Sequence, residues 1–69
     1  MRVTGTVKFF NGAKGFGFIT PEDGSKDVFV HATALSRAGL SGLVEGQRVR
    51  MQVGQGQKGF EAQTIELLA

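Results

Sequence analysis

The sequence predicts an all-β domain built as a five-stranded antiparallel barrel with a Greek-key order of strands. Three observations favour this class. The chain has 11 glycines among 69 residues, its apolar residues fall in short β-branched or aromatic runs, and turn-forming residues separate those runs. At this length we expect one domain that spans residues 1–69.

Turn residues mark the ends of the expected strands. Asn11-Gly12 ends the first strand, Pro21 to Ser25 separates the second from the third, and Gly54 to Gln57 precedes the last. After a short helical turn at Ala32 to Leu35, residues 36–46 form a loop too long for a hairpin, which is therefore either functional or a crossover. The expected strands are Val3 to Asn11, Gly15 to Thr20, Asp27 to His31, Gln47 to Val53 and Gly59 to Leu67. A barrel of this kind is the OB-fold, whose second and third strands face oligonucleotides.

Aromatic residues concentrate in the first three expected strands. Five of the six phenylalanines lie between Phe9 and Phe29, interleaved with glycine and lysine. Strand alternation predicts one face with Phe16, Phe18, Phe29 and His31, and the opposite face with Ile19, Val28 and Val30. The aliphatic residues then fill the core and leave a platform of flat rings beside lysines. Flat rings stack on bases and lysines pair with phosphates, so the pattern predicts binding of single-stranded nucleic acid.

Two short segments resemble the ribonucleoprotein motifs of the bacterial cold-shock proteins. They are Lys14-Gly15-Phe16-Gly17-Phe18-Ile19 and Val28-Phe29-Val30-His31. Gly5 to Asn11, Asp23 to Asp27 and Leu43 to Gln47 also resemble segments of that family, so the resemblance covers the whole chain. It implies a monomer that binds single-stranded RNA and DNA with loose sequence preference. It also implies an RNA chaperone that affects transcription and translation under cold or other stress.

The chain departs from the family at a few aromatic positions. The family usually has tryptophan in place of Phe9, phenylalanine in place of Ala32, and often an aromatic residue near Leu40. Gly59-Phe60 stands where the family has Gly-Pro, and adds a ring elsewhere. We therefore expect a reduced platform and weaker binding than a fully aromatic relative shows.

The candidate nucleic-acid-binding residues combine rings for stacking with polar side chains for phosphates and base edges. They are Lys8, Phe9, Phe10, Asn11, Lys14, Phe16, Phe18, Asp27, Phe29, His31 and Lys58. The base contact of Asp27 is implied by the resemblance, and Asn11 is also a candidate for capping a turn. We expect Gly15 and Gly17 to serve the curvature of the barrel rather than to contact phosphate.

Positions 9 and 10 leave an alternative open. If Val7 lies in the core, strict alternation turns Phe9 inward and Phe10 outward. The resemblance instead places the ring at position 9 on the binding surface. A β-bulge or strong bend would reconcile the two readings, so both rings remain candidates.

Composition excludes several other classes of protein. The chain has no cysteine and one histidine, so we expect no disulfide, metal site or other cofactor. No paired carboxylates, Ser/His/Asp set or Walker spacing is present, which argues against an enzyme, including a nuclease, and we expect no small-molecule substrate. The N-terminus lacks the apolar stretch of a signal peptide, and no apolar run approaches the roughly 20 residues of a membrane span. We therefore expect a soluble cytoplasmic protein with no membrane partner.

One alternative function is a small β-barrel that binds protein, with the rings forming a peptide groove. SH3-like domains bind proline-rich peptides in this way. The absence of tyrosine and tryptophan, and the lysines among the rings, favour nucleic acid over peptide.

Overall fold

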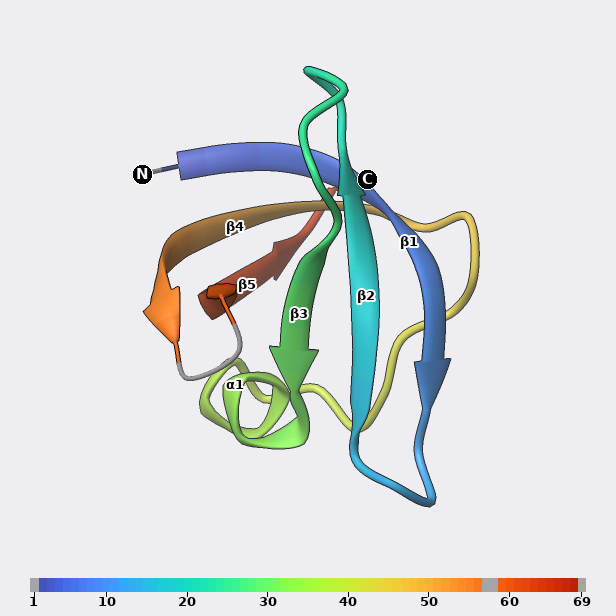
Figure 1. Ribbon diagram of the computed structural model, residues 1–69. Coiled ribbons are helices and arrows are strands. Elements are labelled where there is room, and N and C mark those ends of the chain that lie inside the picture. Colours follow the sequence, from blue (N-terminus) through green and yellow to red (C-terminus); the bar gives the residue numbers. More distant parts are fainter. Residues whose placement is uncertain (1, 57–58, 69) are drawn as a thin grey trace.

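The computed structural model describes residues 2–56 and 59–68. Its elements are β1 Arg2–Asn11, β2 Phe16–Pro21, β3 Val28–His31, α1 Ala32–Arg37, β4 Arg48–Gly56 and β5 Gly59–Leu67 (Figure 1). The expected five-stranded barrel is confirmed, and the bounds of β5 are those predicted. β4 continues to Gly56, through the glycine-rich stretch that we expected to be a turn. α1 continues to Arg37, beyond the predicted end of the helical turn at Leu35.

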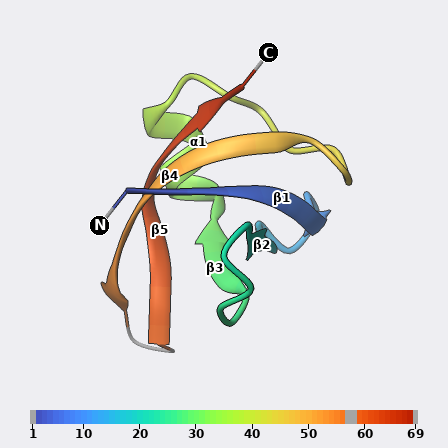
Figure 2. The ribbon, with the colours of Figure 1, turned by 90° about the horizontal axis from the view of Figure 1, so that it is seen from above.

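The strands close into a barrel in the order β1-β2-β3-β5-β4 (Figures 1 and 2). Four of the five contacts are antiparallel, whereas β3 and β5 are parallel and pair through Phe29–Glu61 and Val30–Ala62. Strand direction cannot alternate all the way around a ring with an odd number of strands. One contact must therefore be parallel, which refines the antiparallel barrel predicted from the sequence.

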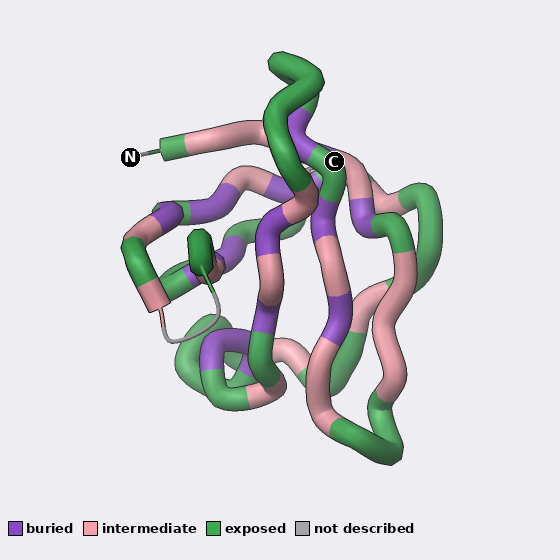
Figure 3. The backbone as a smooth tube through the Cα atoms, in the orientation of Figure 1, coloured by how far each residue is buried: buried purple, intermediate pink, exposed green. Residues whose placement is uncertain are grey.

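The core is aliphatic and follows the predicted alternation. Ile19 and Val30 are completely buried, and Figure 3 shows buried residues alternating with partly exposed ones along β2 and β3. α1 lies at the foot of β3 and adds its own buried residues to the core (Figure 1). The core residues are Val7, Ile19, Val28, Val30, Ala34, Leu35, Val49, Met51, Val53, Ala62 and Ile65.

A β-bulge at Lys8 decides where the two adjacent rings of β1 lie. Val7 pairs with Ile19 and Phe9 pairs with Phe18, so the register shifts across Lys8. The extra residue resets the alternation and puts Phe9 on the same face as Phe18. Phe10 then turns to the other side and packs against the core. Strict alternation was therefore the wrong guide at these two positions.

Gly17 lets β1 approach β2 closely beside the bulge. A Cβ atom at this position would lie 2.4 Å from the Phe9 carbonyl oxygen and 2.9 Å from the Phe10 Cα. Real Cβ atoms are not found so close to backbone atoms, so only glycine fits without a shift of the strand. This geometry supports the structural role that we expected for Gly17.

Candidate nucleic-acid interface

Five aromatic side chains from β1, β2 and β3 form one surface, which we call the aromatic face. Residues directly opposite each other on neighbouring strands share a face of the sheet. The register therefore places Phe9, Phe18 and Phe29 in one row. Asn11, Phe16 and His31 form the next row. The aromatic face consists of Phe9, Phe16, Phe18, Phe29 and His31.

The rings of the aromatic face contact one another without gaps. Ring centroids are 5.7 Å apart for Phe9–Phe18 and for Phe18–Phe29, and 5.9 Å apart for Phe16–Phe29. These separations lie within the roughly 4.5–7 Å range of favourable ring pairs. All four phenylalanines are only partly buried. The result is a continuous apolar platform with ring surface open to a ligand.

His31 both belongs to this platform and caps α1. Its ring centroid lies 6.4 Å from that of Phe29. Its Nδ1 accepts a hydrogen bond from the Thr33 backbone N–H at 3.2 Å, which makes it the N-cap of α1. The cap restrains the orientation of an otherwise exposed imidazole. Sequence reasoning missed this role, although a polar residue directly before a helical turn is the usual signal.

Lys8 and Asp27 meet at the edge of the aromatic face. Lys8 Nζ donates to Asp27 Oδ2 at 3.0 Å, and Thr20 Oγ1 donates to Asp27 Oδ1 at 3.0 Å. These two hydrogen bonds hold the pKa of Asp27 below its usual value, and the bond from Lys8 has the larger effect. The ion pair is solvent-exposed, and such pairs contribute only about 0–1 kcal/mol. Either partner can therefore exchange it for a ligand at little cost.

Asn11 and Lys14 lie at the turn between β1 and β2. Asn11 Oδ1 accepts a hydrogen bond from the Lys14 backbone N–H at 3.0 Å, so Asn11 caps the turn. Lys14 is exposed, and only Gly15 separates it in sequence from Phe16. Lys58, a further candidate, lies outside the described residues.

Phe10 is the predicted site residue that the structure separates from the aromatic face. Its ring packs against the core and lies about 4 Å from where a Cβ would stand on Gly12 or Gly42. The bulge at Lys8 is the physical reason, because it shifts the alternation by one residue, so that Phe9 faces outward and Phe10 inward. Contrary to the prediction, Phe10 therefore does not belong to the aromatic face but packs beneath it against the core.

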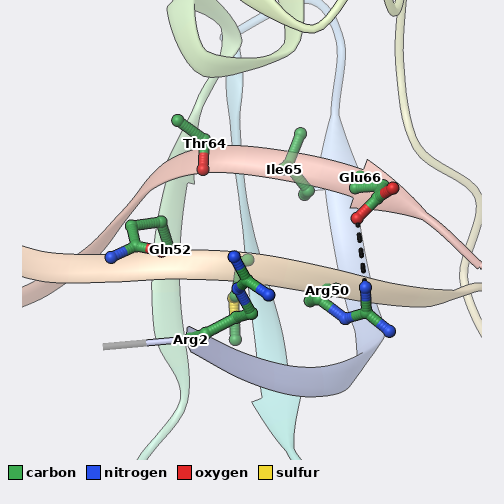
Figure 4. A pocket seen from close by; sticks show the side chains of 7 residues that line it. Arg2, Arg50, Gln52, Thr64, Ile65 and Glu66 are labelled. Atoms are coloured by element: carbon green, nitrogen blue, oxygen red, sulfur yellow. Dashed lines mark hydrogen bonds and ion pairs between the residues drawn. The ribbon is translucent and has the colours of Figure 1, made fainter.

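A second hollow lies on β1, β4 and β5 and differs in chemistry. Figure 4 shows Arg2 and Arg50 projecting over it, with β2 and β3 behind, and Arg50 Nη1 lies 3.5 Å from Glu66 Oε1. No aromatic residue is among those that line it. This surface offers charge without stacking.

Membrane-spanning and metal-binding features are absent from the part of the chain that the structure describes. None of its helices is long and apolar enough to cross a bilayer. Across residues 2–56 and 59–68, no three His, Cys, Asp or Glu side chains come together as a potential metal site.

The closed barrel and its ring-bearing second and third strands define an OB-fold nucleic-acid-binding domain. The model of the family described as 'Cold-shock' DNA-binding domain matches residues 3–68, and the chain belongs to this family. The expected family is thus confirmed, and with it a role in nucleic-acid binding rather than catalysis.

Curated relatives agree with this assignment. The Cold shock-like protein CspE of Escherichia coli (strain K12) is 55% identical over 64 residues, which cover 93% of each chain. The Cold shock-like protein CspC of Shigella flexneri is 59% identical with the same coverage. CspE of Buchnera aphidicola subsp. Acyrthosiphon pisum (strain APS) is 53% identical, again over 93% of each chain.

Proposed function

We propose that residues 1–69 form a monomeric, cytoplasmic domain that binds single-stranded RNA and DNA on the aromatic face and acts as a passive RNA chaperone. The observation that carries this proposal is the unbroken contact of Phe9, Phe16, Phe18 and Phe29 across three strands. A core does not need these rings, because eleven other side chains already fill it. Exposed rings are a liability in so small a domain unless a ligand covers them.

Stacking supplies most of the binding free energy in this proposal. Each base stacked on an aromatic ring contributes roughly 1–3 kcal/mol, measured by alanine substitution. Ordering the flexible strand offsets much of the total. We expect a footprint of about six nucleotides, inside the usual range of roughly 4–16 for such barrels. Duplex binds poorly, because paired bases cannot present their faces to the rings.

Phosphate contacts supply a smaller, salt-dependent part. Lys8 and Lys14 flank the aromatic face, and Asp27 offers an acceptor to a base edge once Lys8 turns to phosphate. Two to four contacts give a slope of log affinity against log salt of about −1.4 to −2.8, at about −0.7 per contact.

Chaperone action follows from binding alone. A protein that captures transiently unpaired strands shifts a weak hairpin toward its open form by mass action. No nucleotide hydrolysis is needed. The curated relatives are named cold shock-like proteins, which supports a role under cold or other stress.

Fluorescence anisotropy of a labelled seven-base oligothymidine tests the proposal directly. The label belongs on the oligonucleotide, because the chain has neither tryptophan nor tyrosine. We expect saturable binding that weakens with salt, and much weaker binding to a duplex of the same length. A fluorophore–quencher RNA hairpin should open in proportion to added protein without ATP. Absence of oligonucleotide binding below about 100 µM, a weak-affinity limit of roughly −5.5 kcal/mol, would overturn the proposal.

A further inference from the structure

We propose that the aromatic face continues past β3 onto the start of β5, where Phe60 and Lys26 form a subsite for one further nucleotide. The base stacks on the ring of Phe60 and the adjoining phosphate pairs with Lys26. This inference rests on the proposed function and adds to it a subsite outside the two ribonucleoprotein-like motifs.

A groove joins Phe60 to the aromatic face. It has a volume of about 310 Å³ and is lined by Phe18, Lys26, Asp27, Phe29, Gly59 and Phe60. That volume is at the lower end of the roughly 300–1,000 Å³ found for small-ligand clefts, which suits one flat heterocycle. Two rings of the aromatic face form one wall, so a base in the groove continues the same stack.

The ring of Phe60 is unusually exposed. It is 56% exposed, whereas the other five phenylalanines are all partly buried. It also borders an apolar hollow at the end of the barrel, together with Val3, Val28 and Val53. A ring that bridges the barrel end and the aromatic face is positioned to receive a base from the solvent side.

The parallel contact between β3 and β5 explains why Phe60 lies there. Phe29 pairs with Glu61, so the start of β5 lies beside the end of the row Phe9–Phe18–Phe29, and Glu61 is the residue that shares its face. Phe60 precedes Glu61, and its ring lines the same groove as Phe18 and Phe29. Alternation within single strands gives no information about this neighbour, since β5 is distant from β3 in sequence.

The charges in the groove favour a phosphate at Lys26. Lys26 is exposed and has no carboxylate partner within ion-pair distance among the described residues. Asp27, the acidic residue of the groove, is already paired with Lys8. A cation without a competing partner beside an exposed ring provides the two contacts that one nucleotide requires. The subsite also offsets the rings that Ala32 and Leu40 do not supply.

A single introduced tryptophan reports on this subsite specifically. Phe60→Trp places the only indole of the protein in the groove, and Val44→Trp places one on the loop before β4, where Val44 is 70% exposed. Oligothymidine without a label should quench the fluorescence of the Phe60→Trp protein at the concentrations at which anisotropy shows binding. It should leave the fluorescence of the Val44→Trp protein unchanged.

The two readouts separate the subsite from the function on which it rests. Binding by anisotropy with no fluorescence change in the Phe60→Trp protein would overturn the subsite and leave the proposed function standing. Absence of binding by anisotropy in the wild-type protein would overturn both.

A length series measures the extra nucleotide. Oligothymidines of increasing length are titrated against wild type, Phe60→Ala, Phe60→Leu and Val44→Ala, with thermal unfolding of each variant as a check on the fold. Phe60→Leu keeps apolar cover over the barrel end but removes the ring.

Both Phe60 variants should bind long oligonucleotides about 5-fold or more weakly, as expected for a lost stack. Their affinity should also stop rising one nucleotide earlier than in wild type and Val44→Ala. Equal affinities and equal plateau lengths in all four proteins would refute the subsite.

Discussion

Lys8 and Asp27 form an ion pair across the edge of the aromatic face, with Lys8 Nζ 3.0 Å from Asp27 Oδ2. Both residues are candidates for contacts with nucleic acid, and in the free protein they form an ion pair with each other. Lys8 lies on the bulge of β1, while Asp27 directly precedes β3. A ligand that binds at this edge therefore replaces the Lys8–Asp27 ion pair instead of meeting two unpaired side chains.

Removing Lys8 should change the salt dependence of binding. Lys8→Ala is expected to make the slope of log affinity against log salt shallower by about 0.7, the value for one phosphate contact with a single strand. Anisotropy titrations at several salt concentrations measure this slope. Arg2→Ala is the matched control, because it removes the same charge from the hollow on β1, β4 and β5. Identical slopes for the two variants would mean that Lys8 acts only through net charge.

Asp27 should make folding stability depend on pH at the acid end. Its pKa is lowered in the folded protein, first by the hydrogen bond from Lys8 and then by that from Thr20. A lowered folded pKa contributes stability that is fully present above the ordinary value of 3.8 and is lost as pH falls through the folded pKa. Urea unfolding at pH 6 and below pH 3.8 should therefore show a stability difference between wild type and Asp27→Asn that shrinks in acid. A difference that stays constant over this range would contradict the assignment.

Removing a ring from the platform should weaken binding more than folding. Phe18→Ala and Phe29→Ala are each expected to reduce oligonucleotide affinity by about 1–3 kcal/mol, the range for one stacked base. Both rings are only partly buried, so the folded barrel should persist in both variants. Anisotropy gives the affinity and circular dichroism checks the fold. Val44→Ala, an exposed aliphatic truncation at a residue that is not part of the aromatic face, should bind as wild type does.

Adding a ring beside His31 should strengthen binding. Ala32 is the first residue of α1 and directly follows His31 on the aromatic face. Ala32→Phe is expected to tighten oligothymidine binding several-fold, because one more base gains a stacking partner worth roughly 1–3 kcal/mol before ordering costs. Ala32→Leu controls for added apolar bulk. Unchanged affinity in a folded Ala32→Phe protein would show that this position does not meet the strand.

Gly17 should tolerate no side chain. In Gly17→Ala the new Cβ meets backbone atoms of Phe9 and Phe10, so β1 and β2 must separate. We expect destabilisation of at least about 1–3 kcal/mol, as overpacked sites show. Gly42→Ala is the control, since the nearest atom to its Cβ is 3.9 Å away. Thermal unfolding compares the two, and similar melting temperatures would disprove the close approach.

Local pattern was enough to predict most of the fold. The alternation of Phe16 and Phe18 with Gly17 and Ile19 correctly separated platform from core, because both faces of β2 follow one unbroken period. Turn residues placed all five strands. β4 ran longer than expected because Gly54 and Gly56 continue its pairing with β5, and glycine alone does not end a strand when a partner strand is available.

Relationships between distant segments could not be predicted in the same way. The bulge at Lys8 changes the phase of β1, and nothing in the residues around it specifies on which side of the strand the extra residue falls. The Lys8–Asp27 pair and the groove at Phe60 both depend on which strands become neighbours when the barrel closes. These features arise from three-dimensional closure and not from the periodicity of any single strand.

The bulge at Lys8 shifts the alternation of inward-facing and outward-facing residues along β1 by one residue. Residues before it follow one assignment of inside and outside, and residues after it follow the reverse. Removing that one residue would restore an unbroken alternation in which Phe9 still faces outward after Val7 and Phe10 still turns inward. The bulge therefore lets β1 carry one additional residue, a lysine at the edge of the aromatic face, without exchanging the surroundings of the two rings that follow it.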